Sequence, residues 1–446
     1  MARNHLRAAW LLVLSACSAH PTRTTATSAN APATEASSAA SAAAPAQNVT
    51  ALFARELDAL PPSVAVSGRG WSAQVPGRNP TVKNGSTEGT EELDFAFEGT
   101  GPVECIVFSE AFDPGSYVGN IVEELKKSLE VVNFTPTRFT VEQEIPAYFT
   151  SIFYRKKTEK GVLAGQLKLA LGLHLTRPVV CLHDVPGYTT TFESVTRAMF
   201  ANYRVADAPP PLAVTIGVAR IGTMPIGITR ETASLLEDGR TQFTTISTQI
   251  VPRSANELMI SDEAEVAFVA KSKLVEAHFI QGDLHGEKMN LILKAGTGNK
   301  YQVSGTLGQN KPLKATITTK HGLPSPAATS LRLKQEMAKA KSFRFIEPEY
   351  HPALDPTNIM DVSYTRTQAD KPKLVRVGLG QLELLATVDD EGEQLQTEMK
   401  AGSQTIIFER VYHRDDRKDQ TKGHDTNTNT NTSQALTPKK AAALKP

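Results

Sequence analysis

The stretch Gln166-Leu167-Lys168-Leu169-Ala170-Leu171-Gly172-Leu173-His174-Leu175, residues 166–175, places a leucine at every second position. Successive side chains of a β-strand point to opposite faces of a sheet, so this period of two predicts a strand with one apolar face. His174 lies opposite the leucines, where we expect it to be solvated or partly covered. We place the strand in a sheet of a first globular unit, residues 49–207.

The flanking sequence predicts that this unit mixes strands with two main helices. One helix follows an apolar strand at residues 104–108 and carries an apolar stripe, with spacings of three and four, from Val118 to Val132. The other opens at Thr190-Thr191-Phe192-Glu193, which has the spacing of a capping box. An antiparallel meander with two helices predicts a layered α/β sandwich. Further strands are predicted at residues 137–143, 147–155 and 178–184.

This order of elements over residues 49–207 resembles the PsbP-like α+β fold, which occurs in many small exported proteins. The resemblance rests on the order of elements and on no catalytic motif. It implies a binding or assembly-factor module, because a shared fold does not fix a chemistry.

Cys105 and Cys181 both lie on predicted strands of this unit. Outside the cytoplasm two such cysteines can form a disulfide, and a bridge over so long a loop stabilises a fold by about 2–4 kcal/mol. The alternative is two buried, reduced thiols, because the sequence does not show whether the two strands are neighbours.

The segment Ala208-Pro209-Pro210-Pro211 marks a boundary, since consecutive prolines stiffen the chain and remove backbone donors. Residues 212–412 then predict successive β-hairpins and one helix, which opens at Ser325 with Pro326 in its first turn and runs to about Lys341. We expect a mostly antiparallel β domain whose curved sheet covers its apolar face with that helix or with a ligand. The fold class predicted for the whole chain is therefore α+β.

An acidic turn, Asp389-Asp390-Glu391-Gly392, separates two predicted strands of this second unit, and Gly402 and Glu409 follow it. The pattern resembles an exported β-domain family that often accompanies secreted transglutaminase-like domains and is similar to the lipoprotein-carrier fold. The resemblance covers residues 212–412 and brings no catalytic residues. It implies a scaffold or a binder of hydrophobic ligands.

The N-terminus has the order of a secretory signal, with Arg3 and Arg7, an apolar run at residues 8–14, and then small residues. Leu14-Ser15-Ala16-Cys17 resembles the lipobox of bacterial lipoproteins. The resemblance implies that residues 1–16 are a signal peptide and that Cys17 carries a diacylglycerol and a further acyl chain such as palmitate. Several acyl chains anchor a protein stably in a membrane.

Ser18 follows the cysteine, which by resemblance to Gram-negative sorting favours the outer membrane, with the protein in the periplasm. The alternative is an ordinary secreted protein cut near residues 15–19. Residues 17–48 are predicted to be a disordered tether, because their Ala, Ser, Thr and Pro cannot bury enough apolar surface to fold. Residues 413–446 are predicted to be a disordered tail, in which Lys439-Lys440 could touch an anionic surface.

The composition and the missing motifs exclude several functions. Without residues 1–16 the chain has 46 basic and 47 acidic residues, so it lacks the basic footprint of a nucleic-acid partner. The sequence has no nucleophile elbow, no phosphate-binding loop and no His-Glu-x-x-His motif. Cys105 and Cys181 lie in apolar strands, where a reactive thiolate is disfavoured. We therefore expect no cofactor and no enzymatic activity.

Two groups of polar residues remain as weak candidates for a site. Glu276 and His278, followed by Asp283 and His285, could supply carboxylate and imidazole ligands to zinc from a hairpin, but such residues also occur on the solvated face of a sheet. His183-Asp184 could orient an imidazole for proton transfer, but no nucleophile can be assigned to it.

These observations predict a lipid-anchored envelope protein with a binding or scaffolding role and without catalysis. Its partner would be another envelope protein or a lipid-like, apolar ligand, and the second unit is the better candidate for that ligand. The rival hypothesis is an envelope enzyme, or an accessory subunit of one, whose site is assembled from distant residues. Converging ionisable groups with perturbed pKa values would favour the rival.

Overall fold

The computed structural model describes residues 49–97, 100–110, 113–135, 137–159, 161–206, 210–254, 257–283, 286–308, 310–366, 373–402 and 404–416. The predicted signal peptide and tether, with Cys17, and most of the predicted C-terminal tail lie outside these residues. Strands hold about 60% of the described residues and helices 13%. The chain is therefore mostly antiparallel β, and the prediction of an α+β fold with a layered α/β sandwich is wrong.

The reason for this error lies in strands that local sequence patterns did not reveal. Residues 63–96, for which no element was predicted, form four strands. The apolar stripe that predicted a helix as far as Val132 is interrupted, because the helix ends at Ser128 and residues 130–134 form a strand.

The first part of the chain contains two antiparallel sheets. A three-stranded sheet has the order β1-β2-β11, and an eight-stranded sheet has the order β3-β4-β5-β10-β9-β8-β6, with β7 paired to β8. The bounds of these strands are β1 Ser63–Gly68, β2 Trp71–Pro76, β3 Arg78–Asn84, β4 Thr90–Ala96, β5 Pro102–Phe108, β6 Glu130–Phe134, β7 Arg138–Glu142, β8 Ile145–Thr158, β9 Gly161–Gly172, β10 Val179–His183 and β11 Arg204–Val205.

The helices of this part are α2 (Val49–Phe53), α3 (Pro114–Ser128) and α4 (Thr189–Ala201). Helix α4 packs on one face of the eight-stranded sheet, where Phe200 belongs to a core that also holds Trp71 of the small sheet. Helix α3 packs on the other face through Val118 and Val122. The leucine stripe of β9 faces α3, as Leu167, Leu169 and Leu171 lie in the cores on that side.

The N-terminus of α4 is not closed by the predicted capping box. Its first residue follows Tyr188, which provides no side-chain cap. The carboxylate of Glu56 accepts hydrogen bonds from the backbone N–H of Thr190 at 2.8 Å and of Thr191 at 2.7 Å instead. A carboxylate suits this position because the N-terminus of a helix carries a partial positive charge. The Glu193 side chain pairs with Arg138.

The second part of the chain forms one fourteen-stranded antiparallel sheet with the order β19-β18-β17-β16-β15-β14-β13-β12-β25-β24-β23-β22-β21-β20. Its strands are β12 Ala213–Ile221, β13 Met224–Leu235, β14 Thr241–Ser254, β15 Glu257–Ala270, β16 Lys273–Asp283, β17 Gly286–Ala295, β18 Lys300–Leu307, β19 Lys311–Thr318, β20 Phe343–Glu349, β21 Met360–Arg366, β22 Leu374–Leu379, β23 Leu382–Val388, β24 Gln394–Ala401 and β25 Gln404–Asp415.

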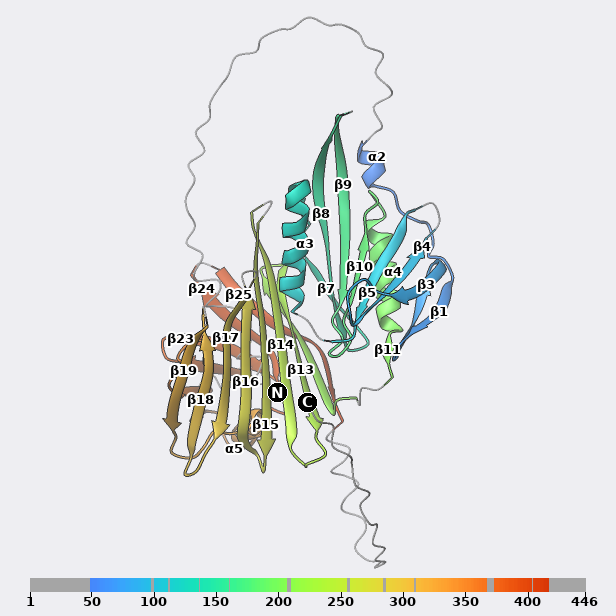
Figure 1. Ribbon diagram of the computed structural model, residues 1–446. Coiled ribbons are helices and arrows are strands. Elements are labelled where there is room, and N and C mark those ends of the chain that lie inside the picture. The colour runs from blue at the N-terminus through green and yellow to red at the C-terminus, as the bar shows by residue number, and fades with distance from the viewer. Residues whose placement is uncertain are drawn as a thin grey trace, which may run out of the picture.

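This large sheet is curled, so that β23, β24 and β25 lie behind β13–β17 in Figure 1. The rings of Phe279 on β16 and Tyr350 after β20 lie 5.3 Å apart, although their strands are far from each other in the sheet. We call the face that carries Phe279 the inner face. Helix α5 (Pro326–Lys339) packs against a core of the inner face through Leu333.

Helix α5 begins as predicted, because the residues at its start determine its N-terminus locally. The Ser325 side chain accepts a hydrogen bond from the backbone N–H of Ala328 at 3.2 Å, and Pro326 occupies the first turn, where no N–H is needed.

The outer face of the large sheet packs against the first part of the chain. Ile250 on β14 and Ile260 on β15 share a core with Val118, Leu169 and Leu171. Asp262 on β15 caps α3, because its carboxylate accepts hydrogen bonds from the backbone N–H of Gly115 at 3.0 Å and of Ser116 at 2.7 Å. The two parts are thus joined by apolar packing and by a cap that one provides to the other.

A second polar anchor joins the two parts at the turn between β7 and β8. Gln143 and Glu144 adopt positive φ angles of 46° and 72°, which a tight hairpin turn requires. The turn presents the Glu144 carboxylate to β25, where it accepts hydrogen bonds from the Tyr412 hydroxyl at 2.9 Å and from the Arg414 guanidinium.

Candidate functional site: a polar belt on the inner face

The central strands of the large sheet carry polar side chains on the inner face, where a sheet core is usually apolar. The strand register places Thr215, Glu231, Thr245 and Glu265 in one row, which ends at Phe279 and therefore lies on the inner face. Two further rows follow in the same register. We call the whole set the polar belt, and its members are Thr215, Thr229, Glu231, Thr245, Ser247, Gln249, Ser261, Glu263, Glu265 and Gln281.

Part of the polar belt is hydrogen-bonded within itself. The Thr229 hydroxyl donates to Ser247 at 3.2 Å, and the Gln281 amide donates to the carboxyl group of Glu263 at 3.1 Å. Thr215 lies 2.9 Å from Nδ1 of His413. These contacts fix side chains of the belt in two neighbouring rows.

Other polar atoms of the belt are buried without a partner among the described residues. They are both polar atoms of the Gln249 amide, the Thr245 hydroxyl and Oε2 of Glu263. Gln249 is only 1% exposed. A buried polar group without a hydrogen bond costs about 1–3 kcal/mol, so a protein interior rarely keeps one without a compensating ligand or water molecule.

Burial also raises the pKa of two carboxyl groups of the belt. Burial raises the pKa of Glu263 to about 8, and the nearby Asp262 adds to the rise, while hydrogen bonds from Ser261 and Gln281 oppose it. Burial raises the pKa of Glu231 well above its usual value, and the charges of Glu393 and Glu265 act in the same direction. Near neutral pH the Glu263 carboxyl group is therefore protonated, so it both donates and accepts hydrogen bonds.

The polar belt is flanked by two apolar clusters that the chain itself fills. On one side, Leu291 and Leu293 pack with Tyr350 and Leu323. On the other side, Tyr364 packs in a core that also includes Leu333 of α5. The apolar regions of the inner face are thus covered by the chain, and the polar belt between them carries the unmet hydrogen bonds.

A second group of polar residues lies beside α5. The Thr329 hydroxyl donates to Glu347 at 2.5 Å, and the Arg332 guanidinium lies 3.4 Å from the same carboxylate and stacks over the Phe345 ring. A groove of about 380 Å³ runs along this side of α5 and ends near Ser272. All of its charged groups are paired locally, so it offers fewer unmet hydrogen bonds than the belt.

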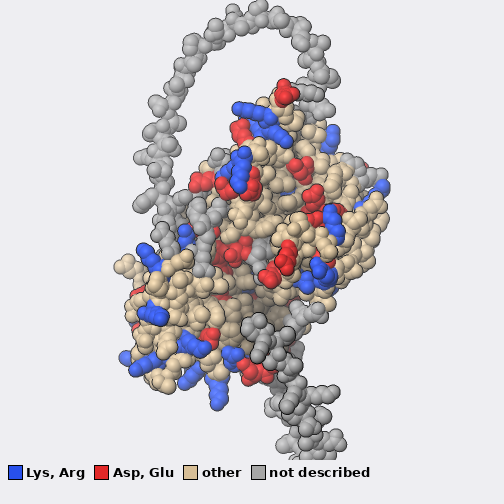
Figure 2. Space-filling view, in the orientation of Figure 1, with Lys and Arg blue, Asp and Glu red and all other residues tan. Residues whose placement is uncertain are grey.

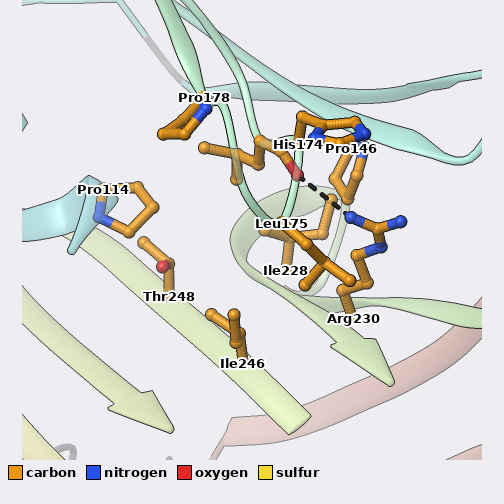
Figure 3. Close-up of a pocket in the computed structure, with 10 residues that line it drawn as sticks. Pro114, Pro146, His174, Leu175, Pro178, Ile228, Arg230, Ile246 and Thr248 are labelled. Atoms are coloured by element: carbon orange, nitrogen blue, oxygen red, sulfur yellow. Dashed lines mark hydrogen bonds between the residues drawn. The ribbon is translucent and has the colours of Figure 1, made fainter. Parts of the chain in front are cut away.

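A small cavity of about 40 Å³ lies at the junction of the two parts of the chain (Figure 3). Leu173, His174 and Pro146 line it from the first part, and Arg230, with Thr248, lines it from the large sheet. Burial, with the charges of Arg230 and Arg177, lowers the pKa of His174 to about 4, so this histidine is neutral. It is partly covered, as the sequence predicted.

Cys105 and Cys181 form a disulfide in the structure. The two residues are direct neighbours in register on the adjacent antiparallel strands β5 and β10, and both are buried. The bridge is therefore a cross-strand link inside the core between the eight-stranded sheet and α4, remote from the polar belt.

The candidate zinc ligands are only partly brought together. Glu276 and His278 lie two residues apart on β16, with 2.7 Å between Oε1 and Nε2, and Lys294 also pairs with Glu276. Asp283 pairs with Lys288, and His285 lies outside the described residues. Across the part of the chain that the structure describes, no three His, Cys, Asp or Glu side chains gather as a metal site.

His183 and Asp184 do not form a proton-transfer pair. His183 is buried and stacks on the Phe192 ring with 6.0 Å between centroids, and burial with the nearby Lys168 lowers its pKa to about 3. Asp184 accepts a hydrogen bond from the Tyr154 hydroxyl at 2.5 Å. His183 is thus a neutral core residue.

Exposed cations gather at one edge of the large sheet. Figure 2 shows Lys and Arg side chains along the lower edge in that view, below the strands β15–β19. Lys271, Lys273, Lys300 and Lys320 are exposed in or beside the turns of this edge.

None of the described helices is long and apolar enough to cross a bilayer.

Sequence reasoning did not find the polar belt. Its residues belong to five different strands, so only the register brings them together. One local signal was present, because the segment Thr244-Thr245-Ile246-Ser247-Thr248-Gln249 has polar residues on both alternating faces, and an ordinary core strand keeps one face apolar.

Known proteins are similar to this chain only in part. No family model matches it, and no curated protein matches its sequence. A β-barrel-like protein of a domain of unknown function, DUF1849, from Brucella abortus is 11% identical with a TM-score of 0.34, and the match covers 46% of this chain and 97% of that one. A protein from Bacteroides thetaiotaomicron is 11% identical with a TM-score of 0.22, over 36% of this chain and 53% of that one.

Proposed function

We propose that this protein is a lipid-anchored protein of the cell envelope whose large sheet binds a ligand through the polar belt. The observation that carries the proposal is the Gln249 amide, buried at 1% exposure with both polar atoms unpartnered among the described residues, beside a neutral Glu263. Such a group is costly unless something supplies its hydrogen bonds. The anchor is proposed from Cys17 and its lipobox-like context.

The chemistry of the belt favours a neutral ligand with amide or hydroxyl groups. Gln249 offers one donor group and one acceptor, and a protonated Glu263 offers both as well. A ligand anion would meet carboxyl groups instead of cations. The apolar clusters on either side are filled by the chain, so the belt selects its ligand through hydrogen bonds. The lipid-like character of the ligand is proposed from the envelope location that Cys17 implies.

The ligand test compares wild-type protein with Gln249→Leu, both purified from native membranes in mild detergent. We expect mass spectrometry of organic extracts to find a neutral lipid-like compound with the wild type and at least tenfold less with the variant. The matched control is Gln302→Leu, because Gln302 is exposed on β18. It should retain the compound.

Three results would contradict the binding proposal. The first is the absence of any compound above background in the wild-type extract, which would mean that water alone supplies the missing hydrogen bonds of the belt. The second is equal recovery from wild type and Gln249→Leu. The third is equal loss in Gln302→Leu. Thermal unfolding of the same samples checks that Gln249→Leu is folded. We expect a Tm close to that of the wild type, because replacing an unpartnered buried amide by an apolar side chain of similar size costs little stability.

The anchor has a test of its own. Wild-type protein should fractionate with outer membranes, and Cys17→Ala should move to the soluble fraction, because several acyl chains are needed for stable anchoring. A Cys17→Ala protein that still fractionates wholly with membranes would contradict the anchor and leave the ligand proposal intact.

The second candidate function is an envelope enzyme or its accessory subunit. The raised pKa values of Glu231 and Glu263 favour it, because a neutral carboxyl group near neutral pH can serve as a general acid. Under this hypothesis the wild-type protein would convert the bound compound into a product during incubation. The variant Glu263→Gln would bind the same compound but would not convert it. Identical spectra for the two proteins after incubation would exclude it.

A further inference from the structure

Arg230 is a buried guanidinium whose charge is not matched by a direct partner. It lies on β13 of the large sheet, is 7% exposed and donates from Nη1 to the carbonyl oxygen of Leu173 at 3.4 Å. Its Nε–H has no hydrogen-bond partner among the described residues. Figure 3 shows this single bond as the dashed line to Arg230.

The carboxylate that influences Arg230 most is Glu144, but that group is already engaged. Glu144 accepts hydrogen bonds from Arg414 and from the Tyr412 hydroxyl. Burial lowers the pKa of Arg230 to about 10, with Glu144 opposing and Arg414 supporting the shift, so the guanidinium stays charged at neutral pH. Glu144 is thus shared between Arg414 and Tyr412 and is not a direct partner of Arg230.

A buried charge without a counter-charge is expensive, and the effective penalty in proteins is several kcal/mol. A water molecule can accept the hydrogen bond of Nε–H, but it brings no charge. An anion supplies both the acceptor and the charge, and its attraction to the guanidinium is strong because apolar side chains such as Pro146, Pro178 and Ile228 surround the site.

The cavity beside Arg230 limits the size of such an anion. Its volume of about 40 Å³ exceeds the roughly 10–15 Å³ that one water molecule requires. It is too small for an acyl chain, whose sites measure several hundred Å³. His174 lines the same cavity and is neutral, so it adds no second positive charge beside Arg230. A neutral imidazole still carries one ring N–H that can donate a hydrogen bond to an anion.

We propose that the cavity at the junction binds one small monovalent anion of the size of chloride, held by the guanidinium of Arg230. The site takes Arg230 from the large sheet and Leu173 and His174 from the first part of the chain, so the anion joins the two parts. This proposal stands on the Arg230 geometry alone and does not depend on the function proposed for the polar belt.

Binding at a junction predicts a stabilisation that depends on the kind of anion. A ligand that binds only the folded state raises its stability with concentration. At equal ionic strength, we expect the Tm of wild-type protein in 200 mM sodium chloride or bromide to exceed that in sodium gluconate by about 2–4 °C. Gluconate is too large for the cavity, and equal ionic strength removes general screening from the comparison.

The variant Arg230→Met replaces the unbranched aliphatic part of the side chain and removes the guanidinium and its charge. We expect its Tm to be the same in chloride and in gluconate. The control Arg155→Met, which alters an exposed arginine on β8, should keep the difference of the wild type. Crystals of wild-type protein grown in sodium bromide should show an anomalous peak beside Nε of Arg230.

The proposal is overturned by either of two results. One is a wild-type Tm that is equal in the three salts, together with a bromide structure that shows only water beside Arg230. The other is a chloride effect that persists in Arg230→Met, which would place the anion elsewhere. If Arg230→Met does not fold, the bromide structure of the wild type decides alone, because presence of the peak supports the site and its absence rejects it.

Discussion

At the scale of single residues, the buried carboxyl groups of the polar belt give the protein a distinctive pH dependence. Glu263 has a pKa of about 8 in the folded protein and an ordinary value near 4.3 when unfolded. The folded state therefore binds one more proton than the unfolded state between these values. The stability linked to this group is fully present below about pH 4 and is lost as pH rises to about 8.

The variant Glu263→Gln tests this dependence. We expect the free energy of unfolding of the wild type, from urea titrations between pH 5 and 8, to fall more steeply than that of the variant, by up to about 1.4 kcal/mol per pH unit. The control Glu104→Gln, an exposed position on β5, should follow the wild type. Parallel curves for wild type and Glu263→Gln would contradict the raised pKa.

At the scale of elements, the sequence predicted what is encoded locally. Helix α5 starts where Ser325 and Pro326 place it. The alternating leucines predicted β9 and its buried face, although the strand begins at Gly161 and ends at Gly172, before Leu173 and Leu175. The end of α3 was misjudged because Leu129 and Val132 continue the helical spacing by chance, while residues 130–134 pair with β8. A strand that depends on a distant partner leaves a weak local signal.

The helix caps show the same limit. Helices α3 and α4 are closed by Asp262 and Glu56, each remote from its helix in sequence. A capping box can be read from spacing, but a cap from a distant strand or loop cannot. For the same reason the polar belt, which is assembled by the register of β12–β16, could not be predicted, and the disulfide between β5 and β10 could only be considered.

Removal of the distant cap should weaken α3 and its docking together. We expect Asp262→Ala to lower the free energy of unfolding by about 1–3 kcal/mol, because the backbone N–H groups of Gly115 and Ser116 and the Thr248 hydroxyl all lose their acceptor. Urea denaturation measures the change. Asp238→Ala, in an exposed turn, is the control, and an equal loss in both variants would contradict the role of the cap.

At the scale of the whole molecule, the two parts of the chain are held together by contacts of different kinds. The core around Ile250 and Leu169 provides apolar area, while the Glu144 turn provides a directed anchor on β25. The interface thus fixes the orientation of the large sheet relative to the eight-stranded sheet. In the proposed function, the belt would therefore bind its ligand in a fixed orientation relative to the eight-stranded sheet.

The anchor can be tested by its effect on β25. We expect Glu144→Ala to increase hydrogen–deuterium exchange of residues 404–415 and to lower the free energy of unfolding by about 1–2 kcal/mol, since the Tyr412 hydroxyl loses its acceptor and Arg414 loses one of its acceptors. Glu142→Ala removes a neighbouring carboxylate that pairs with Arg197 inside the first part. Exchange of β25 that rises as much in Glu142→Ala would contradict the anchor.

The position of β25 has a consequence for how the protein folds. The large sheet has its first strand, β12, and its last strand, β25, side by side in the middle, with Ala213 opposite Asp415. On either side of this pair, every strand is hydrogen-bonded to a neighbour in sequence, so each wing can assemble from local hairpins. The central seam joins residues roughly 200 positions apart and costs the most loop-closure entropy. The pairing of β12 with β25 can therefore form only after the last strand has been synthesised. A chain that crosses a membrane unfolded would complete this slow folding step after the crossing.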